Sequence, residues 1–439
     1  MIKFYGRESE LEALNENFLL SKKSAQMSII LGRRRIGKTL LSLEFAKKSK
    51  HLYLFISKKS ESLLCEEFVQ KIEKTYSKQV IGEITSFKQI FSLIIEISKQ
   101  KSVTLILDEF QEFYKINPSI YSEIQALWDL NKATCRLNLI LIGSIYSLMY
   151  KIFQHFREPL FGRVDSIIHL KPFSIKVLKE ILSDYSLTKK NLVFDYFVFT
   201  GGMPKYVELL SQKKANSQKK IVNTIIKENS LFLSEGKNLL IEEFGRNYTV
   251  YFSILELISV GKTSRNEISS IIKNDIGGYL ERLEKDYSII KKYKPINAKA
   301  NSRNQKYEIV DNFLKFWFRF IFKNRSALES GNLEYIKQDI WLNYSVYCGR
   351  MLEKYFIELF KESKKYNRIG SYWERGNKNE IDLVAINDQK KIVVIAEVKL
   401  NEKKINIEKL KQKAKKLILS FKDYKISYIG LSLGREHIV

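Results

Sequence analysis

One stretch of this chain has residue types and spacing that suit phosphate binding: Leu31-Gly32-Arg33-Arg34-Arg35-Ile36-Gly37-Lys38-Thr39-Leu40-Leu41. It matches the pattern Gly-x-x-x-x-Gly-Lys-Thr, and it lies between an apolar run and an amphipathic helix pattern. Gly32 and Gly37 permit close backbone approach, so consecutive N–H groups and the next helix's N-terminus can surround an anion. Lys38 would reach the β- and γ-phosphates, and the Thr39 hydroxyl would ligate Mg²⁺. The residues from Gly32 to Leu40 therefore predict a site for ATP and Mg²⁺.

Two acidic residues, Asp108 and Glu109, follow the buried apolar strand pattern 103–107. The carboxyl end of such a strand is where parallel sheets bind ligands, so Asp108 would hold Mg²⁺ and Glu109 would polarise the attacking water. Ser144 follows the strand pattern 137–142 and is a candidate sensor of the γ-phosphate, although an ordinary turn and helix cap would explain it equally well. Arg163 could stabilise charge during phosphoryl transfer, in cis or from a neighbouring subunit, or be a solvated surface residue.

The elements that must position these residues alternate between strand and helix patterns. After the phosphate loop come a helix pattern at 40–48, a strand at 51–56, helices at 61–75 and 86–98, and then the strands before Asp108 and Ser144. This alternation predicts an α/β fold with a parallel, doubly wound sheet.

A second group of chemically capable residues lies near the C-terminus. Two strand patterns, 379–386 and 392–399, flank a turn at 387–390. With the turn centred between residues 388 and 389, Glu397 faces Glu380 and lies diagonal to Asp382, while Lys399 follows on the same face. Acids that converge in this way repel one another unless a cation neutralises them, and hard carboxylate oxygens favour Mg²⁺ or Mn²⁺. The spacing predicts a metal site.

The middle of the chain predicts a winged helix-turn-helix. Helix patterns at 252–259, 264–271 and 276–286 precede strand patterns at 289–293 and 306–310, and Ser264 with Glu267 forms a capping-box pattern. The third helix mixes basic with acidic residues, so contact with DNA and packing against the remainder of the protein both stay open. The aromatic run 313–320 predicts a helix buried in a core.

The composition bounds the class of protein. The chain has 439 residues, 45% of them hydrophobic, and a formal net charge of +26, which suggests a polyanionic partner such as DNA. A lysine-rich proteome would explain the charge as well. The odd cysteine count fits a reducing cytoplasm, and we expect neither a signal peptide nor a membrane span. The lysine-rich tail predicts a basic amphipathic helix that is either a solvated face or a surface that binds phosphates. These lysines are Lys403, Lys404, Lys409, Lys411, Lys413, Lys415 and Lys416.

The first half of the chain resembles the archaeal-type ATPases of the AAA+ and STAND group. The motifs that carry the resemblance are Gly6-Arg7-Glu8, the phosphate loop, Leu107-Asp108-Glu109-Phe110-Gln111, Gly143-Ser144, Pro159-Leu160-Phe161-Gly162-Arg163 and Gly201-Gly202-Met203-Pro204-Lys205-Tyr206. The resemblance implies a helical lid after the sheet, a Gly-Gly-x-Pro turn near the nucleotide base, a sensor role for Ser144 and a charge-stabilising role for Arg163.

The C-terminal cluster looks like that of PD-(D/E)xK nucleases. The resemblance implies that Asp382 and Glu397 are metal ligands and that Lys399 is the catalytic lysine. It also implies that Glu353 is the acid supplied by a helix and a further metal ligand. Glu380-Ile381 stands before Asp382 where the family name would place Pro. Gly349-Arg350-x-Leu352-Glu353 and the Phe-Trp-Phe-Arg-Phe run also resemble a C-terminal domain often fused to archaeal-type ATPases.

We therefore expect a P-loop ATPase core at 1–172, a helical lid at 173–240, a winged helix at 241–310 and an α/β, restriction-endonuclease-like domain at 311–439. The leading hypothesis is an ATP-hydrolysing, DNA-binding protein whose P-loop domain regulates a Mg²⁺-dependent nuclease. The alternatives are a STAND-like signalling ATPase or a winged-helix regulator, in which the C-terminal domain binds partners without cutting. An Arg acting in trans would require a homo-oligomer.

Overall fold

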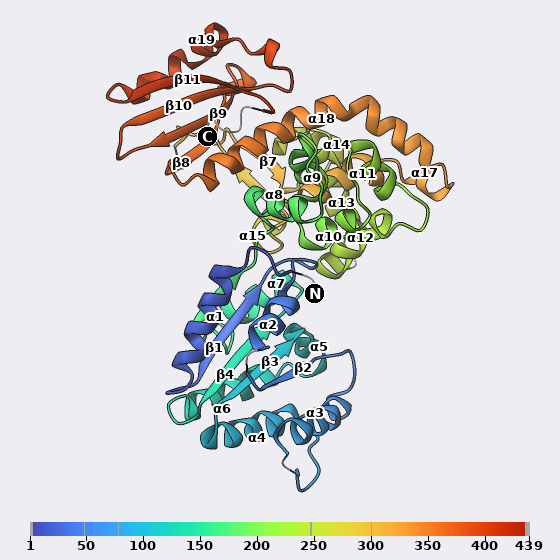
Figure 1. Cartoon of the computed structure of the whole chain (residues 1–439), viewed down its shortest axis with the longest axis vertical. Helices are drawn as coiled ribbons and strands as arrows, with labels where there is room; N and C mark the ends of the chain where they lie inside the picture. Colours follow the sequence, from blue (N-terminus) through green and yellow to red (C-terminus); the bar gives the residue numbers. More distant parts are fainter. Residues whose placement is uncertain (1–2, 48, 78, 246–247, 300, 435–439) are drawn as a thin grey trace. The chain divides into compact units, whose positions relative to one another are not determined.

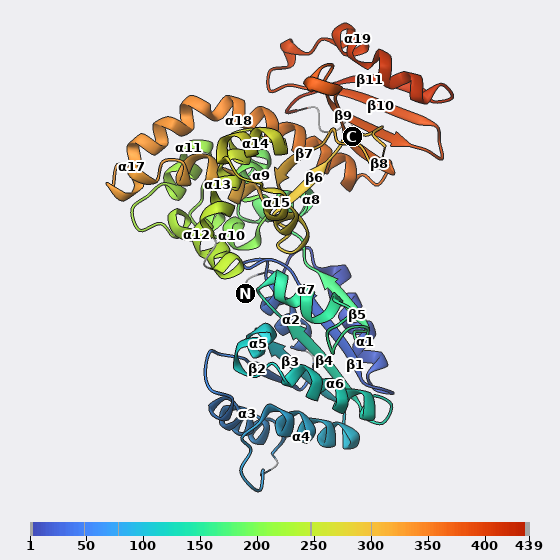
Figure 2. The same ribbon diagram turned by 180° about the vertical axis from the view of Figure 1, so that it is seen from behind.

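The computed structural model describes residues 3–47, 49–77, 79–245, 248–299 and 301–434. The chain divides into two compact units, Met1–Pro172 and Phe173–Val439. Figures 1 and 2 present the ribbon from two opposite sides. Among the described residues, no helix has the length and apolar character that crossing a bilayer requires.

The first unit alternates strands with helices, as expected. Its elements are α1 Glu8–Leu20, β1 Gln26–Leu31, α2 Lys38–Ala46, β2 His51–Phe55, α3 Glu61–Tyr76, α4 Phe87–Gln100, β3 Val103–Asp108, α5 Phe113–Ile116, α6 Ile120–Asn131, β4 Leu137–Ile142, α7 Tyr146–Gln154 and β5 Ser166–His169.

The strands of this unit form a parallel sheet in the order β2-β3-β4-β1-β5, which confirms the predicted α/β class. Every residue of β1, β3 and β4 is buried, which explains why these strands read as continuous apolar runs. In a parallel sheet the carboxyl ends of neighbouring strands share one edge. The segments that follow β1, β3 and β4 carry the phosphate loop, Glu109 and Ser144, so this edge collects the predicted nucleotide residues.

The second unit begins with helices and a short antiparallel hairpin. Its elements to this point are α8 Ile175–Asp184, α9 Leu192–Thr200, α10 Pro204–Gln212, α11 Gln218–Ile225, α12 Leu231–Phe244, α13 Tyr248–Ser259, α14 Arg265–Ile272, α15 Gly277–Lys285, β6 Ile290–Tyr293 and β7 Lys306–Ile309. The predicted capping box is present, because Ser264 and Glu267 bond each other's backbone at the start of α14. Three helices followed by a hairpin is the element order of a winged helix, and the assignment to that fold stays a prediction.

An aromatic core follows. Phe313, Phe316, Trp317 and Phe320 are all buried, as predicted for core packing. The expected single helix is instead α16 Asn312–Phe316 followed by a π-helix at Trp317–Phe322. After α17 Arg325–Glu329, helix α18 runs from Leu333 to Glu362. The side chain of Asn332 caps the start of α18 by accepting a hydrogen bond from the Tyr335 N–H.

The C-terminal part is a mixed sheet between two helices. Its elements are β8 Arg368–Tyr372, β9 Ile381–Asn387, β10 Ile392–Val398, α19 Ile407–Ile418 and β11 Lys425–Leu431. The order is β11-β10-β9-β8, with β8, β9 and β10 antiparallel and β11 parallel to β10. Helix α19 packs its Leu410, Ala414 and Leu417 on this sheet, and α18 also contacts β8, β9 and β10 (Figure 1).

Candidate functional site

The phosphate loop runs from the end of β1 to the start of α2. Gly32 has φ of +154°, and a Cβ there would lie 3.1 Å from the backbone oxygen of Leu170, so a side chain would be strained and crowded. Helix α2 begins at Lys38, so the N-terminus of this helix lies at the loop. This arrangement suits an anion at the helix N-terminus.

Lys38 lies inside the loop and is buried. Its Nζ donates to the backbone oxygens of Gly32 at 2.8 Å and Arg33 at 3.0 Å, so the ammonium already stands among the loop residues. Arg7 is also buried, and its Nη2 donates to the backbone oxygen of Ile36 at 3.4 Å. Only a motif resemblance had drawn attention to Arg7, and its contact with the loop is a tertiary one.

Thr39 and Asp108 meet at the edge of the sheet. The Thr39 hydroxyl donates to Asp108 Oδ2 at 2.7 Å, and the Glu109 N–H donates to Asp108 Oδ1 at 2.8 Å. The two residues are 69 positions apart in the chain. A hydroxyl and a carboxylate held together beside a phosphate loop are the hard oxygen donors that Mg²⁺ prefers, so these residues fit the predicted ion.

Glu109 is held by two polar side chains. Ser144 Oγ donates to Glu109 Oε2 at 2.6 Å, and Gln111 Nε2 donates to the same oxygen at 2.5 Å. Glu109 has φ of +57°, a left-handed conformation that is unfavourable for a residue other than Gly and that occurs often at functional sites. The contact that the structure gives Ser144 is therefore with the predicted catalytic acid. Its role as a γ-phosphate sensor stays a prediction.

Gly143 makes this arrangement possible. A Cβ on Gly143 would lie 2.3 Å from the Met149 side chain and 2.5 Å from Gln111 Oε1. Any side chain at this position would therefore displace the glutamine that holds Glu109. Gln111 was not among the predicted site residues. The one sequence signal for it is its place in the motif Leu107-Asp108-Glu109-Phe110-Gln111, directly after the two acids.

Arg163 lies away from the phosphate loop. Arg163 precedes the start of β5, whereas the loop follows the end of β1. Because β1 and β5 are parallel neighbours, Arg163 and the loop lie at opposite ends of the strands. Its guanidinium binds Asp129, with Nη2 2.9 Å from Oδ2. Within this unit Arg163 therefore does not reach the loop, which corrects the cis alternative. A role in trans from another copy of the chain stays a prediction.

The C-terminal cluster forms at the ends of β9 and β10, with a register that differs from the prediction. The pairs run from Ile392 with Asn387 to Ala396 with Leu383, so continuing them places Glu397 opposite Asp382. The register moves by two residues because the turn centres between Gln389 and Lys390, where the Asn387 side chain accepts from the Lys390 N–H. A shift of two preserves the face, so Asp382 and Glu397 still meet.

Lys399 lies between the two acids. Its Nζ is 3.1 Å from Asp382 Oδ2, 3.6 Å from Glu397 Oε1 and 3.2 Å from the backbone oxygen of Val398. Glu380, the third acid that the register predicted, instead pairs with Lys306 at 2.9 Å. In the described part of the chain, no three His, Cys, Asp or Glu side chains gather closely enough to hold a metal ion. The predicted three-acid site is therefore reduced to two carboxylates and a carbonyl oxygen around one cationic atom.

The charges of nearby acidic residues, Asp382 of this cluster among them, change the pKa of Glu353 on α18. Burial, and then the negative charges of Asp382 and Glu380, raise the pKa of Glu353 to about 8, while Lys399 opposes the shift. Lys399 itself has a raised pKa: burial alone would lower it, but the charge of Asp382 and its hydrogen bond overcome that effect. A carboxyl group that holds its proton near neutral pH beside two further carboxylates is typical of functional sites.

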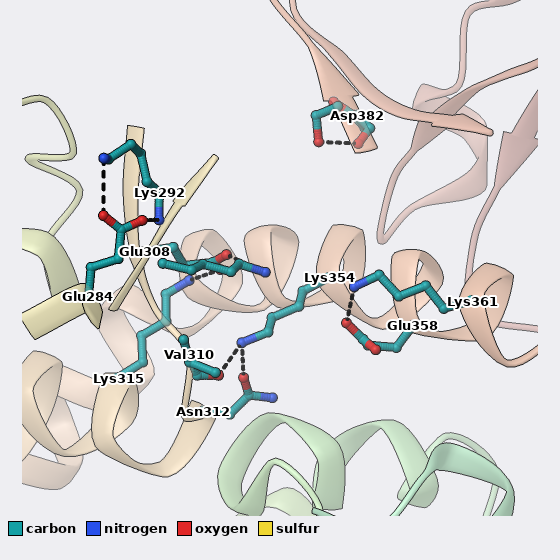
Figure 3. Close-up of polar contacts among 12 residues, drawn as sticks. Glu284, Lys292, Glu308, Val310, Asn312, Lys315, Lys354, Glu358, Lys361 and Asp382 are labelled. Carbon is teal, nitrogen blue, oxygen red and sulfur yellow. Dashed lines mark hydrogen bonds and ion pairs between the residues drawn. The ribbon is translucent and has the colours of Figure 1, made fainter. Parts of the chain in front are cut away.

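The neighbouring Lys354 anchors α18 to the segment before α16 and to the start of α16. Figure 3 shows its Nζ donating to the backbone oxygen of Val310 at 2.7 Å and to Asn312 Oδ1 at 2.6 Å. Burial lowers the pKa of Lys354 to about 8. The amide nitrogen of Asn312 donates in turn to the backbone oxygen of Phe197 in α9. These bonds fix the segment of α18 that carries Glu353.

The lysine-rich tail forms α19 and the turn before it. Most of its lysines are exposed, and Lys413 Nζ lies 3.9 Å from Glu397 Oε1. The basic helix therefore passes directly beside the acidic cluster. The exposed members are Lys403, Lys404, Lys409, Lys411, Lys415 and Lys416.

Two family models match this chain. One describes an ATPase domain found predominantly in Archaea and matches residues 4–210, and the other describes archaeal and bacterial proteins of unknown function and matches residues 317–416. The first confirms the predicted archaeal-type ATPase. The second assigns no activity to the C-terminal domain.

Similar proteins extend the comparison over most of the chain. The Walker-type ATPase PABY2304 of Pyrococcus abyssi is 17% identical to this chain and superposes with a TM-score of 0.55. The match covers 72% of this chain and 96% of the P. abyssi chain. The ORC2 protein of Aeropyrum pernix is 13% identical to this chain and superposes with a TM-score of 0.50. That match covers 78% of this chain and 96% of the A. pernix chain. Both show the P-loop ATPase fold. The uncharacterized protein MJECL04 of Methanocaldococcus jannaschii is 32% identical over 413 residues, which span 91% of this chain and 88% of that protein. In this chain a match to the archaeal ATPase domain precedes a match to a domain of unknown function, and the chain belongs to the family of this M. jannaschii protein.

Proposed function

We propose that this protein binds ATP with Mg²⁺ and hydrolyses it at the edge of the parallel sheet. The observation that carries the proposal is the meeting of Thr39 with Asp108 and of Ser144 with Glu109 beside the phosphate loop, from segments far apart in the sequence. Bound Mg²⁺ would supply positive charge to the β- and γ-phosphates.

The chain's own groups have distinct tasks in this proposal. The loop N–H groups and Lys38 bind the phosphates, and Lys38 exchanges its contacts with the loop carbonyls for phosphate oxygens. Thr39 and Asp108 hold the ion. Glu109 orients and polarises the attacking water, and Ser144 and Gln111 keep its carboxylate in place until nucleotide is bound.

Steady-state ATP hydrolysis by the purified full-length chain tests the proposal. Lys38→Ala and Glu109→Gln should each lower kcat by at least about 100-fold, because one loses phosphate binding and the other the general base. Glu109→Gln should still bind a fluorescent ADP analogue, since it leaves the loop intact. Lys47→Ala, which removes an exposed lysine at the end of α2, is the matched control. Wild-type protein that hydrolyses no ATP, or a Glu109→Gln variant as active as wild type, would refute this assignment.

We further propose that the C-terminal domain is a Mg²⁺-dependent DNA nuclease controlled by the ATPase. The specific observation in its favour is the convergence of Asp382, Glu397 and the Val398 carbonyl on Lys399 Nζ. These oxygens already surround one cation, and they are of the kind that binds Mg²⁺ or Mn²⁺. Lys399 would then counter the charge on a phosphate, and Glu353, which has an elevated pKa, could donate a proton near neutral pH.

The partner in this second proposal is the DNA backbone. The net charge of +26 and the exposed lysines of α19 beside Glu397 suit a polyanion, and binding should weaken steeply with salt. The experiment incubates linear and circular DNA with Mg²⁺, with and without ATP. Asp382→Ala and Lys399→Ala should abolish cleavage, whereas Lys390→Ala, in the exposed β9–β10 turn, should leave it intact. DNA that is bound but never cut by wild type would favour a STAND-like or regulatory protein and overturn the nuclease proposal.

Coupling between the two activities has its own test. If the ATPase controls cleavage, Lys38→Ala should change cleavage as well as hydrolysis, although Lys38 belongs to the first unit and the acidic cluster to the second. Cleavage by this variant at the wild-type rate, with and without ATP, would show two independent activities.

A further inference from the structure

Tyr53 lies on strand β2, at the edge of the parallel sheet that carries the proposed ATP site. None of the sequence motifs includes this residue. Strand β2 pairs with β3 so that Tyr53 is opposite Ile106 and Phe55 is opposite Asp108. Leu52 and Leu54 are buried, whereas Tyr53 points to the opposite, more open face. From there its hydroxyl donates to Asp108 Oδ2 at 2.8 Å.

The same oxygen also accepts from the Thr39 hydroxyl at 2.7 Å, and Oδ1 accepts from the Glu109 N–H at 2.8 Å. The Asp108 carboxylate thus accepts hydrogen bonds from Tyr53 on β2, from Thr39 on α2 and from the backbone of the next residue, Glu109. Asp108 is only 3% exposed, so its charge depends on such donors.

The Tyr53 phenol is suited to act as a donor. Its O–H can donate a hydrogen bond, whereas the Asp108 carboxylate can only accept one. Of the side chains that the structure places on Asp108, Thr39 is expected to turn to Mg²⁺, which leaves Tyr53 as the donor with no second task.

We propose that Tyr53 is a positioning residue that fixes the Asp108 carboxylate for Mg²⁺ and so sets how much the ion tightens nucleotide binding. This inference rests on the proposed ATP site. Groups that orient metal ligands typically contribute 10- to 100-fold to metal affinity, and Tyr53 shares the task with the Glu109 N–H. We therefore expect the loss of the Tyr53 hydroxyl to reduce the Mg²⁺-dependent tightening of nucleotide binding about tenfold.

The test measures the dissociation constant of a fluorescent ADP analogue in excess Mg²⁺ and in EDTA, for wild type and for Tyr53→Phe. The quantity compared is the ratio of the two constants within each protein, so a general loss of folded protein cancels. Tyr53→Phe should reduce the Mg²⁺-dependent tightening about tenfold and leave binding in EDTA within about twofold. Tyr121→Phe, which removes a buried hydroxyl of the same unit that bonds the Phe110 carbonyl and not Asp108, is the matched control and should behave as wild type.

Each other outcome is decisive. If Mg²⁺ tightens binding equally in wild type and in Tyr53→Phe, Asp108 does not need Tyr53 and the inference is wrong while the ATP site stands. Weaker binding by the same factor in Mg²⁺ and in EDTA would give Tyr53 a purely structural role and would also overturn it. If Mg²⁺ has no effect on wild type, the proposed Mg²⁺–ATP site fails together with the role of Tyr53.

Discussion

Glu353→Gln should stabilise the second unit, and the gain should grow as the pH rises from 5 to 7. In the folded protein, burial and then the charges of Asp382 and Glu380 raise the pKa of Glu353 to about 8, against 4.5 for an ordinary glutamate. Between these two values the folded protein keeps a proton that the unfolded chain has lost. The free energy of unfolding contributed by this group therefore falls as the pH rises.

The size of the effect follows from the shift. Each pH unit in this window costs about 1.4 kcal/mol, so two units would cost just under about 3 kcal/mol. Part of Glu353 remains exposed to solvent, which weakens the effect, and we expect about 2 kcal/mol. Glutamine is neutral at every pH, so the difference in unfolding free energy between variant and wild type should increase by this amount.

Urea denaturation at pH 5, 6 and 7, followed by tryptophan fluorescence, measures the difference. Of the four tryptophans, Trp317, Trp341 and Trp373 belong to the second unit, so the signal reports mainly on it. Glu358→Gln, which removes a carboxylate of the same helix that pairs with Lys361 at 2.8 Å (Figure 3), measures the ordinary cost of losing a glutamate from α18. A difference for Glu353→Gln that stays constant from pH 5 to 7 would refute the reasoning, because the folded protein would then hold no extra proton.

Two further predictions concern the first unit. Gly143→Ala should lower the free energy of unfolding by about 2 kcal/mol and reduce ATP hydrolysis, because the new methyl group collides with Met149 and with Gln111, which holds Glu109; hydrolysis at the wild-type rate with an unchanged melting temperature would contradict it. Arg163→Ala should leave hydrolysis by dilute protein within about twofold of wild type, since Arg163 binds Asp129 away from the loop; a loss of more than about 100-fold at every protein concentration would place this arginine at the nucleotide in cis.

The proposed nucleotide site shows how much a local sequence pattern can predict. One continuous segment contains Gly32, Gly37, Lys38 and Thr39, so their spacing could be recognised without knowledge of any tertiary contact. Asp108 and Glu109 could also be proposed from the sequence, because the apolar run of a buried parallel strand ends at these two charged residues. The structure then confirmed the parallel sheet that brings these segments to one edge.

The C-terminal cluster shows where pattern stops. Alternation along two strands was sufficient to place Asp382 and Glu397 on one face, since a side-chain period of two survives a register shift of two. The register itself depended on the bond between Asn387 and Lys390 in the turn, and it replaced Glu380 by Asp382 as the partner of Glu397. Likewise, the proton on Glu353 depends on burial and on charges that lie elsewhere in the chain.

The sequence by itself thus determined the chemistry available to this protein: a phosphate loop, two acids after a strand, and an acid–acid–lysine set on a hairpin. Only the tertiary structure decided which groups meet. It directed Tyr53 to Asp108, Gln111 to Glu109 and Arg163 to Asp129. The physical reason is that motifs arise from spacing along one segment, whereas these contacts join segments whose approach is set by sheet order and packing.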